Sequence, residues 1–230
     1  MALKKHDFVE LDFTGIIKDE NITFDTTIEN IAKENKIFNA KIKYKPVVIC
    51  LGESQIIAGL DDKIIGRETG KHRIELKPEE AFGKKDTKLF QLVPLSVFKK
   101  QKIQPFPGLQ VEIDGNMGVI RTSGSRVIVD FNHPFSGKEI IYDIEIKRII
   151  DDEKEKVKSF FDISGIEADV AEKEGKFEVT LKHNLPKELQ EGLAKNISEI
   201  IGKEIVFAEK KEEKKEEKKE EKEEKKEEKS

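Results

Sequence analysis

The sequence predicts an α+β protein built mainly from antiparallel strands, and three observations lead to this prediction. Runs of alternating apolar and polar residues, typical of half-buried strands, recur between residues 7 and 182. Dipeptides such as Asp114-Gly115 stand between several of these runs and are typical of hairpin turns. Apolar residues at helical spacing are confined to a few segments, so few helices are expected.

The first strands are expected within residues 7–51. Residues 7–17 alternate in polarity, but Phe8, Leu11 and Phe13 do not all share one face, so a bulge or register change is expected. The other elements predicted here are a strand from residue 22, a helix over 28–33 capped by residues 25–27, and a strand over 45–51. Cys50 lies in this last strand. As the single cysteine it excludes an internal disulfide, and a buried, unreactive thiol is expected rather than a nucleophile.

The stretch from Leu51 to Gly66 is the one around which the chain is organised. It predicts a turn at Gly52, a short helix that begins near Ser54 as its N-cap, and a helix stop at Gly66. The apolar face of this helix would be formed by Ile56, Ile57, Leu60 and Ile64. Another alternating, strand-like segment follows over residues 70–78.

A set of short motifs resembles the FKBP-type peptidyl-prolyl isomerases in its order along the chain. The motifs are Phe24-Asp25, Lys45-Pro46, Leu51-Gly52, residues 55–60, Gly66, Gly70 and Ala81-Phe82-Gly83. Residues 130–137 and 142–146 resemble the return of that family's chain after a domain inserted in its flap, as in the SlyD-like subgroup. The resemblance covers residues 1–150 and depends on the ordered set, because no single motif is specific.

The resemblance implies an FKBP-like antiparallel sheet wrapped on a short helix, and it divides the chain into four parts. Residues 1–83 and 137–152 would form the isomerase domain, and residues 84–136 an inserted β-rich, insert-in-flap domain. Residues 153–208 would form a small C-terminal α+β domain, as in the archaeal long type. Residues 209–230 contain only Lys, Glu and one Ser, so a solvated tail is expected, with an interaction tail as the alternative.

The predicted inserted domain carries more apolar side chains than about fifty residues bury easily. Its expected strands cover residues 88–93, 110–113, 118–122 and 126–131. The resemblance implies a chaperone domain in which exposed apolar residues bind unfolded chain segments. The residues expected to do so are Phe90, Leu92, Val93 and Phe98. The alternative is that these residues form only the core of the insert itself.

The residue pattern of the C-terminal region, 153–208, predicts the element order α-β-β-α-β. Its elements are expected over residues 153–161, 166–171, 177–182, 186–201 and 204–208. A unit of about 55 residues is marginal for independent folding. It is therefore expected to dock on another domain or to pair with a second copy in a homodimer.

The active site implied by the resemblance is apolar and uses no nucleophile, metal or cofactor. Its catalytic positions would be Asp25, Ile57, Leu60, Phe82 and Tyr142, and its substrate-binding positions Phe13, Phe24, Val47 and Ile56. Leu60 is expected beneath the proline ring, the Ile57 amide on a substrate carbonyl, and Asp25 opposite the twisting amide. Without the resemblance, Asp25 would be interpreted as a helix cap and the isoleucines as ordinary core residues.

Two departures from the family pattern concern hydroxyl groups. Phe82 and Phe13 stand where Tyr is common, so a hydroxyl that could hold a substrate carbonyl is missing. Lower activity, or activity that depends on backbone contacts, is implied. His133 is expected to be a turn residue before Pro134, with a catalytic base or ligand as the alternative, and no histidine shows metal-ligand spacing.

The amino-acid composition of the chain argues against some classes of binding partner. Charged residues make up 39% of the chain but nearly balance, with a net charge of −4, which argues against a nucleic-acid partner. Neither a signal peptide nor an apolar run of membrane-spanning length is recognisable, so a cytoplasmic protein without a membrane partner is expected. The leading hypothesis is an isomerase with chaperone activity on unfolded or partly folded, proline-containing polypeptides. The alternatives are a holdase-type chaperone with weak isomerase activity, and a scaffold that uses residues 153–230 to reach a partner.

Overall fold

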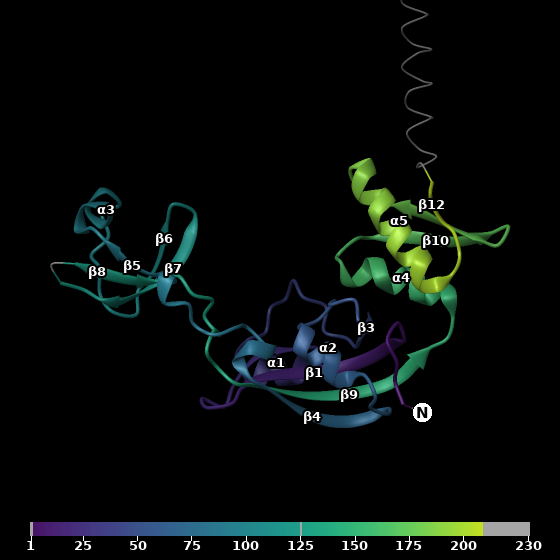
Figure 1. The fold of residues 1–230 in the computed structure, drawn as a ribbon, viewed down its shortest axis with the longest axis horizontal. Helices are drawn as coiled ribbons and strands as arrows, with labels where there is room; N and C mark the ends of the chain where they lie inside the picture. The colour runs from purple at the N-terminus through teal and green to yellow at the C-terminus, as the bar shows by residue number, and fades with distance from the viewer. Residues whose placement is uncertain (1, 125, 209–230) are drawn as a thin grey trace, which may run out of the picture.

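The computed structural model describes residues 2–124 and 126–208, and these residues form three separate sheets (Figure 1). We call the parts around these sheets the central lobe (residues 2–83 and 137–152), the inserted lobe (84–136) and the C-terminal lobe (153–208). Figure 1 shows the inserted lobe at left and the C-terminal lobe at right of the central lobe. The predicted α+β class is confirmed, whereas the predicted tail, residues 209–230, lies outside the described residues.

The central sheet is antiparallel, as predicted, with the order β2-β1-β9-β4 and with β3 paired to β1. Its strands are β1 (Phe8–Ile17), β2 (Ile22–Thr26), β3 (Val47–Cys50), β4 (Gly70–Leu76) and β9 (Ile140–Ile150). The register of β1 against β9 shifts between Glu10 and Leu11, which confirms the irregularity expected in this strand. Phe8 packs into one core cluster and Leu11 into another, because residues three apart in a strand point to opposite faces of the sheet.

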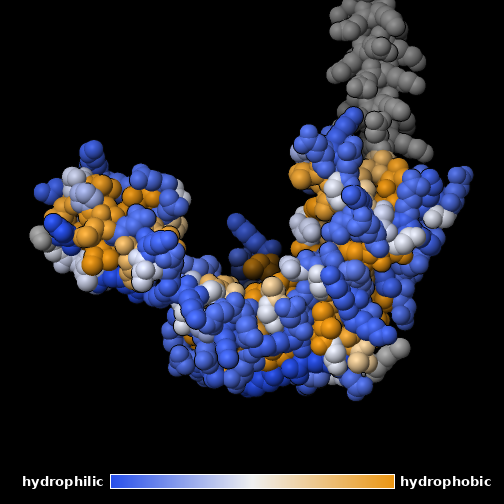
Figure 2. Space-filling view, viewed as in Figure 1, coloured by the Kyte–Doolittle hydropathy of each residue, from blue (hydrophilic) through white to orange (hydrophobic). Residues whose placement is uncertain are grey.

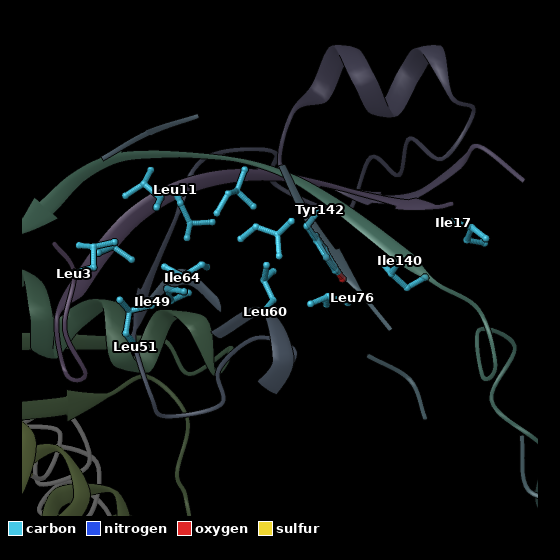
Figure 3. Packing of buried hydrophobic residues seen from close by; sticks show 14 residues of the cluster. Leu3, Leu11, Ile17, Ile49, Leu51, Leu60, Ile64, Leu76, Ile140 and Tyr142 are labelled. Carbon is cyan, nitrogen blue, oxygen red and sulfur yellow. The ribbon is translucent and has the colours of Figure 1, made fainter. Parts of the chain in front are cut away.

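The short helix α2 (Ala58–Ile64) lies against one face of this sheet, where Leu60 and Ile64 join the central core (Figure 3). It begins at Ala58, so the prediction of Ser54 as the N-cap is wrong. Ser54 has a left-handed φ of 53° and belongs to the turn before the helix. That turn is held by the buried carboxylate of Asp61, which accepts hydrogen bonds from the backbone of Gly52 and Ser54 at 2.9–3.1 Å.

Gly59 allows the chain after β4 to pack closely on α2. A Cβ atom at this position would lie 2.2 Å from the carbonyl oxygen of Glu80 in the short 3-10 turn η1 (Pro78–Glu80). This is far inside van der Waals contact, so only glycine fits. The close approach brings the segment that follows η1, including Phe82, against the core that contains α2.

The long loop after β2 carries its own helix, as predicted. This helix, α1 (Glu29–Glu34), has Ile28 at its N-cap and no side-chain cap, so the predicted capping by residues 25–27 is wrong. Instead the Thr27 hydroxyl donates a hydrogen bond to buried Asp12 at 2.6 Å. The polar side chain therefore stabilises the sheet and not the helix.

The inserted lobe is a four-stranded antiparallel sheet with the order β5-β8-β7-β6. Its elements are the 3-10 turn η2 (Thr87–Leu89), β5 (Phe90–Val93), α3 (Leu95–Lys100), β6 (Gln110–Ile113), β7 (Asn116–Thr122) and β8 (Val127–Asp130). The strands were predicted to within a few residues, but α3 was not. Phe98 of α3 is fully buried and closes a core that holds only residues of this lobe.

The C-terminal lobe has the predicted order α-β-β-α-β, and its sheet runs β10-β11-β12. Its elements are α4 (Glu153–Ile163), β10 (Ala168–Lys173), β11 (Lys176–Leu181), α5 (Lys187–Ile201) and β12 (Ile205–Phe207). Phe8, Cys50 and Ile150 of the central lobe share its core cluster, so this lobe is docked on the central sheet. Cys50 is free and buried there, and burial raises the pKa of its thiol to about 12.

Candidate functional site

A cavity of about 430 Å³ opens between the central sheet, α2 and the loop before β3. The structure brings together in it all nine residues of the isomerase site that the sequence predicted. They are Phe13, Phe24, Asp25, Val47, Ile56, Ile57, Leu60, Phe82 and Tyr142. Its lining is mostly apolar, and Asp25 is the only carboxylate among the described lining residues.

The inner surface of the cavity is fixed by the core of the central lobe. Leu60 is only 2% exposed and Tyr142 only 4%, and both belong to the main core cluster. Figure 3 shows these two side chains projecting from α2 and β9 into the space between helix and sheet. Because such a core is close-packed, the shape of this inner surface is fixed.

Aromatic rings form one side of the cavity. The ring of Phe24 lies 5.8 Å from that of Phe82 and 6.0 Å from that of Tyr142, both edge to face. The Phe13 ring lies 5.9 Å from Tyr142 in a similar arrangement. His133 stacks on Phe82 with ring centroids 4.7 Å apart. Each ring is therefore held by neighbours, which keeps this side of the cavity in one shape.

His133 occupies a turn, as the sequence suggested. Its Nδ1 accepts a hydrogen bond from the backbone of Phe135 at 3.2 Å, and its carbonyl accepts one from Ser136. The ring does not line the cavity. Within residues 2–124 and 126–208, no group of three His, Cys, Asp or Glu side chains is placed to hold a metal ion.

Asp25 lies at the rim of the cavity. Its side chain is exposed, yet the apolar surroundings partly desolvate the carboxylate and raise its pKa, while a backbone hydrogen bond from Thr26 opposes the shift. The pKa of Tyr142 is raised as well, first by burial and then by the negative charge of Asp25. The negative charge of Asp25 therefore acts on the Tyr142 hydroxyl, which lies in the deep part of the cavity.

Ile57 stands at the start of α2, where its carbonyl accepts hydrogen bonds from Leu60 and Asp61 at 2.8 and 3.0 Å. Its own N–H takes part in none of the hydrogen bonds of the described residues. The turn before it is held twice, by Asp61 and by Gln55, whose side-chain oxygen accepts from the Cys50 backbone at 2.7 Å. A backbone donor at the cavity is therefore in a defined place.

Two comparisons decide which family the chain belongs to. The family model for FKBP-type peptidyl-prolyl cis-trans isomerases matches residues 1–96. The short-type peptidyl-prolyl cis-trans isomerase of Methanocaldococcus jannaschii is 31% identical over 149 residues, which are 64% of this chain and 94% of that relative. This chain is an FKBP-type peptidyl-prolyl cis-trans isomerase. The FKBP-type 16 kDa isomerase of Escherichia coli K12 is 34% identical over 112 residues, 46% of this chain and 74% of the relative.

The inserted lobe of this FKBP-type isomerase has a match of its own. The model described as the IF domain of FKBP26 covers residues 91–135. The SlyD isomerase of Aeromonas hydrophila is 27% identical over 132 residues, 56% of this chain and 61% of that relative. A SlyD-like layout with an insert in the flap is therefore shown.

The four predicted client-binding residues of the insert fall into two groups. Phe90 is 36% exposed and Leu92 58%, whereas Val93 is 7% and Phe98 0% exposed. Val93 and Phe98 both belong to the core of the inserted lobe, although Val93 also lines a hollow together with Leu92. Phe98 is fully buried and packs as the alternative of a core role expects, whereas a client-binding role of Val93 stays a prediction.

Several lining residues of the isomerase cavity were not predicted. They include Ile42, Lys43, Tyr44 and Lys45 of the loop before β3, together with Gln55 and Ile163. A tyrosine just before Lys45-Pro46 in a long loop was the available signal for the first group. Ile163, the last residue of α4, carried no signal, since it stands far along the chain in another lobe.

No described helix is long and apolar enough to cross a bilayer.

Proposed function

We propose that this isomerase accelerates rotation about Xaa-Pro bonds of folding polypeptides inside the 430 Å³ cavity, by excluding water and favouring the twisted amide. The supporting observation is a mostly apolar cavity whose only described carboxylate stands at its rim. Prolyl isomerisation breaks no bond, and its barrier of roughly 20 kcal/mol comes from amide resonance. The twisted amide is less dipolar than the planar one, so an apolar cavity favours it.

Individual residues have distinct roles in this proposal. The proline ring lies on Leu60, and the Ile57 N–H donates to a substrate carbonyl. The Asp25 carboxylate faces the twisting amide, where exclusion of water strengthens its interaction. The Tyr142 hydroxyl supplies the polar group that Phe13 and Phe82 lack. These roles are consistent with the placement of the four groups around one cavity.

The test is the cis-to-trans conversion of an Ala-Leu-Pro-Phe peptide by the full chain and by two variants. Asp25→Ala is expected to lower kcat/KM by about tenfold or more, because it removes a preorganised charge at the reacting amide. Asp143→Ala is the matched control, since Asp143 is an exposed carboxylate of β9 that does not line this cavity. Equal activity of the two variants would remove Asp25 from the mechanism.

We further propose that the inserted lobe binds unfolded segments of clients. Its described surface exposes Leu89, Phe90, Leu92, Phe106 and Met117 by 36–60%. Figure 2 shows apolar residues gathered on this lobe. An exposed apolar surface of this kind suits extended, apolar chain segments, and a second binding site raises the local concentration of client at the cavity.

A double variant, Leu92→Ser with Phe106→Ser, separates the two activities. Turnover of the tetrapeptide is expected to stay unchanged, whereas acceleration of proline-limited protein refolding and suppression of aggregation should fall several-fold. A matched control is Ile22→Ser, which alters an equally exposed apolar residue of the central lobe. If the intact chain suppresses aggregation but turns over no tetrapeptide, the holdase alternative is correct.

The C-terminal lobe is proposed to pair with a second copy of the chain. Leu189 of α5 and Val206 of β12 remain 57% and 40% exposed after this lobe has docked on the central sheet. Sedimentation of the full chain and of a Leu189→Lys variant tests this. A dimer that the variant converts to monomer supports the proposal, and a monomeric wild type rejects it.

A further inference from the structure

We propose that Ile163 of the C-terminal lobe completes the wall of the isomerase cavity and forms, with Val47 and Ile42, a subsite for an apolar substrate side chain next to the proline. The inference rests on the proposed use of this cavity for prolyl peptides. It assigns to the C-terminal lobe a direct part in substrate selection. Ile163 would be a specificity-determining residue.

Ile163 lies between two hollows. It lines the isomerase cavity, and it also lines a smaller hollow of about 120 Å³ between α4 and the start of β3. Lys45 and Val47 are the other two residues that line both hollows. The junction of the central and C-terminal lobes therefore borders the cavity, and Ile163 stands between the two hollows.

The position of Ile163 is held by the core that the two lobes share. Phe160 and Phe161 of α4 are buried in one cluster with Phe8, Cys50 and Ile150 of the central lobe. Ile163 stands two residues after Phe161 on the same helix and packs, partly buried, against the central core. A side chain at the end of a docked helix has little freedom to move. It acts as a fixed wall rather than as a mobile lid.

The wall on the other side comes from the loop before β3. Ile42 is 54% exposed although its side chain lines the cavity. Tyr44 stacks on Phe38 at 5.4 Å, and its hydroxyl accepts a hydrogen bond from the Asn39 backbone at 2.9 Å. The loop is thus internally braced, and the apolar surface of Ile42 remains to be covered by something that enters the cavity.

The chemistry of this end selects an apolar occupant. Ile163, Val47 and Ile42 offer aliphatic surface and no hydrogen-bonding side-chain group. Lys43 and Lys45 line the same region, and their aliphatic stems can cover an apolar group while the ammonium groups stay in water. The carboxylate of Asp25 belongs to the rim formed by β2. A Leu or Phe side chain beside the proline would therefore gain contact here, and an Ala or Gly would not.

The experiment compares kcat/KM for two series of tetrapeptides, with Gly, Ala, Leu or Phe either before or after the proline. For Ile163→Ala, we expect the preference for Leu or Phe over Ala to fall by about three- to tenfold at one of the two positions, while the Ala and Gly peptides keep their rates. Ile163→Val should give a smaller loss in the same direction. The matched control is Ile166→Ala, because Ile166 packs in the C-terminal core but lines neither hollow.

Three outcomes decide between the possibilities. A loss confined to the bulky apolar peptides supports the subsite. The subsite is overturned if Ile163→Ala and the wild type turn over each peptide at the same rate. It is also overturned if Ile163→Ala lowers kcat/KM equally for all peptides and Ile166→Ala does the same. If the wild type turns over no peptide, the proposed function fails, and the subsite is then judged by affinity. In that case an unchanged Kd of Ile163→Ala for the Ala-Leu-Pro-Phe peptide overturns the inference.

Discussion

The inserted lobe and the C-terminal lobe are attached to the same central sheet in opposite ways. The inserted lobe has a core of its own, which includes Phe98 and Ile120 and no residue of the central lobe. The core of the C-terminal lobe includes Phe8, Cys50 and Ile150 from the central strands. The first lobe can therefore move or unfold by itself, whereas the second is part of the same cooperative unit as the isomerase fold.

The base of the inserted lobe contains a network of polar contacts. The buried carboxylate of Asp130 accepts hydrogen bonds from Arg121, Asn132 and, at 3.3 Å, from Lys85. The Asn132 side chain in turn accepts a hydrogen bond from the Asp86 backbone N–H at 2.8 Å and donates one to the Asp86 carbonyl at 3.0 Å. The outgoing and returning segments are thus joined to each other by polar groups, and Phe135 of the returning segment packs on Phe24 and Phe82 of the central lobe.

The largest expected effect comes from the core that two lobes share. Phe161→Ala should lower the free energy of unfolding by about 3–5 kcal/mol, because it leaves a cavity where α4 meets the central strands. Unfolding in urea, followed by isomerase activity and by circular dichroism, should show one earlier transition in both signals.

The matched variant in the inserted lobe is Phe98→Ala. It removes an equally buried phenylalanine, but from a core that belongs to one lobe. Tetrapeptide turnover should survive while the inserted lobe unfolds early in a separate transition. Loss of turnover in step with this lobe would contradict the contrast between the two attachments.

Cys50 reports on the docking of the C-terminal lobe. Burial raises its thiol pKa to about 12, so at pH 8 we expect its reaction with a thiol reagent to be about a hundredfold or more slower than that of a free thiol. Phe161→Ala should speed the reaction and Phe98→Ala should not. Rapid reaction in the wild type would show that the lobes separate readily.

The pH dependence of stability tests how Asp130 holds the base of the inserted lobe. Burial acts to raise its pKa, but hydrogen bonds from Asn132 and Arg121 outweigh it and bring the pKa to about 2, below the usual 3.8. The ionised form is therefore favoured by folding. The resulting stabilisation, ~2 kcal/mol, is present above pH 3.8 and lost as the pH falls through about 2.

Asp130→Asn should remove this pH dependence and lower the stability of the inserted lobe at pH 7. Thermal unfolding between pH 2 and pH 7, with Phe98→Ala as a variant that keeps the carboxylate, is the measurement. An unchanged acid dependence in Asp130→Asn would show that other carboxylates cause it.

The smallest effect is expected at Ser136, where the chain returns to the central lobe. Its hydroxyl donates to the carbonyl of Phe82 at 3.0 Å, next to the cavity. Ser136→Ala should cost about 1 kcal/mol of stability. If tetrapeptide kcat/KM also changes, the returning segment positions Phe82. An unchanged kcat/KM would mean that ring packing alone is sufficient.

Much of the fold was predictable because it is encoded by local patterns. The alternation in β1, the Asn116–Thr122 and Gln110–Ile113 hairpin around Asp114-Gly115, and the α5 helix stopped at Gly202 all follow from residues close in sequence. The wrong predictions concern polar side chains that could bond to either of two partners, and a sequence pattern does not show which partner is chosen. Ser54 was expected to cap a helix but was taken into a turn by Asp61, and Thr27 bonded to Asp12 across the sheet instead of capping α1.

The sequence by itself determined the family, the α+β class and the nine residues that meet in the cavity, since these depend on motifs and on neighbouring residues. Only the tertiary structure decided that Leu92 faces solvent while Val93 is buried, that Cys50 lies between two lobes, and that Ile163 reaches the cavity. The physical reason is that a periodic pattern shows that an element has an apolar face. Which distant surface covers that face depends on long-range packing, which no short stretch of the chain specifies.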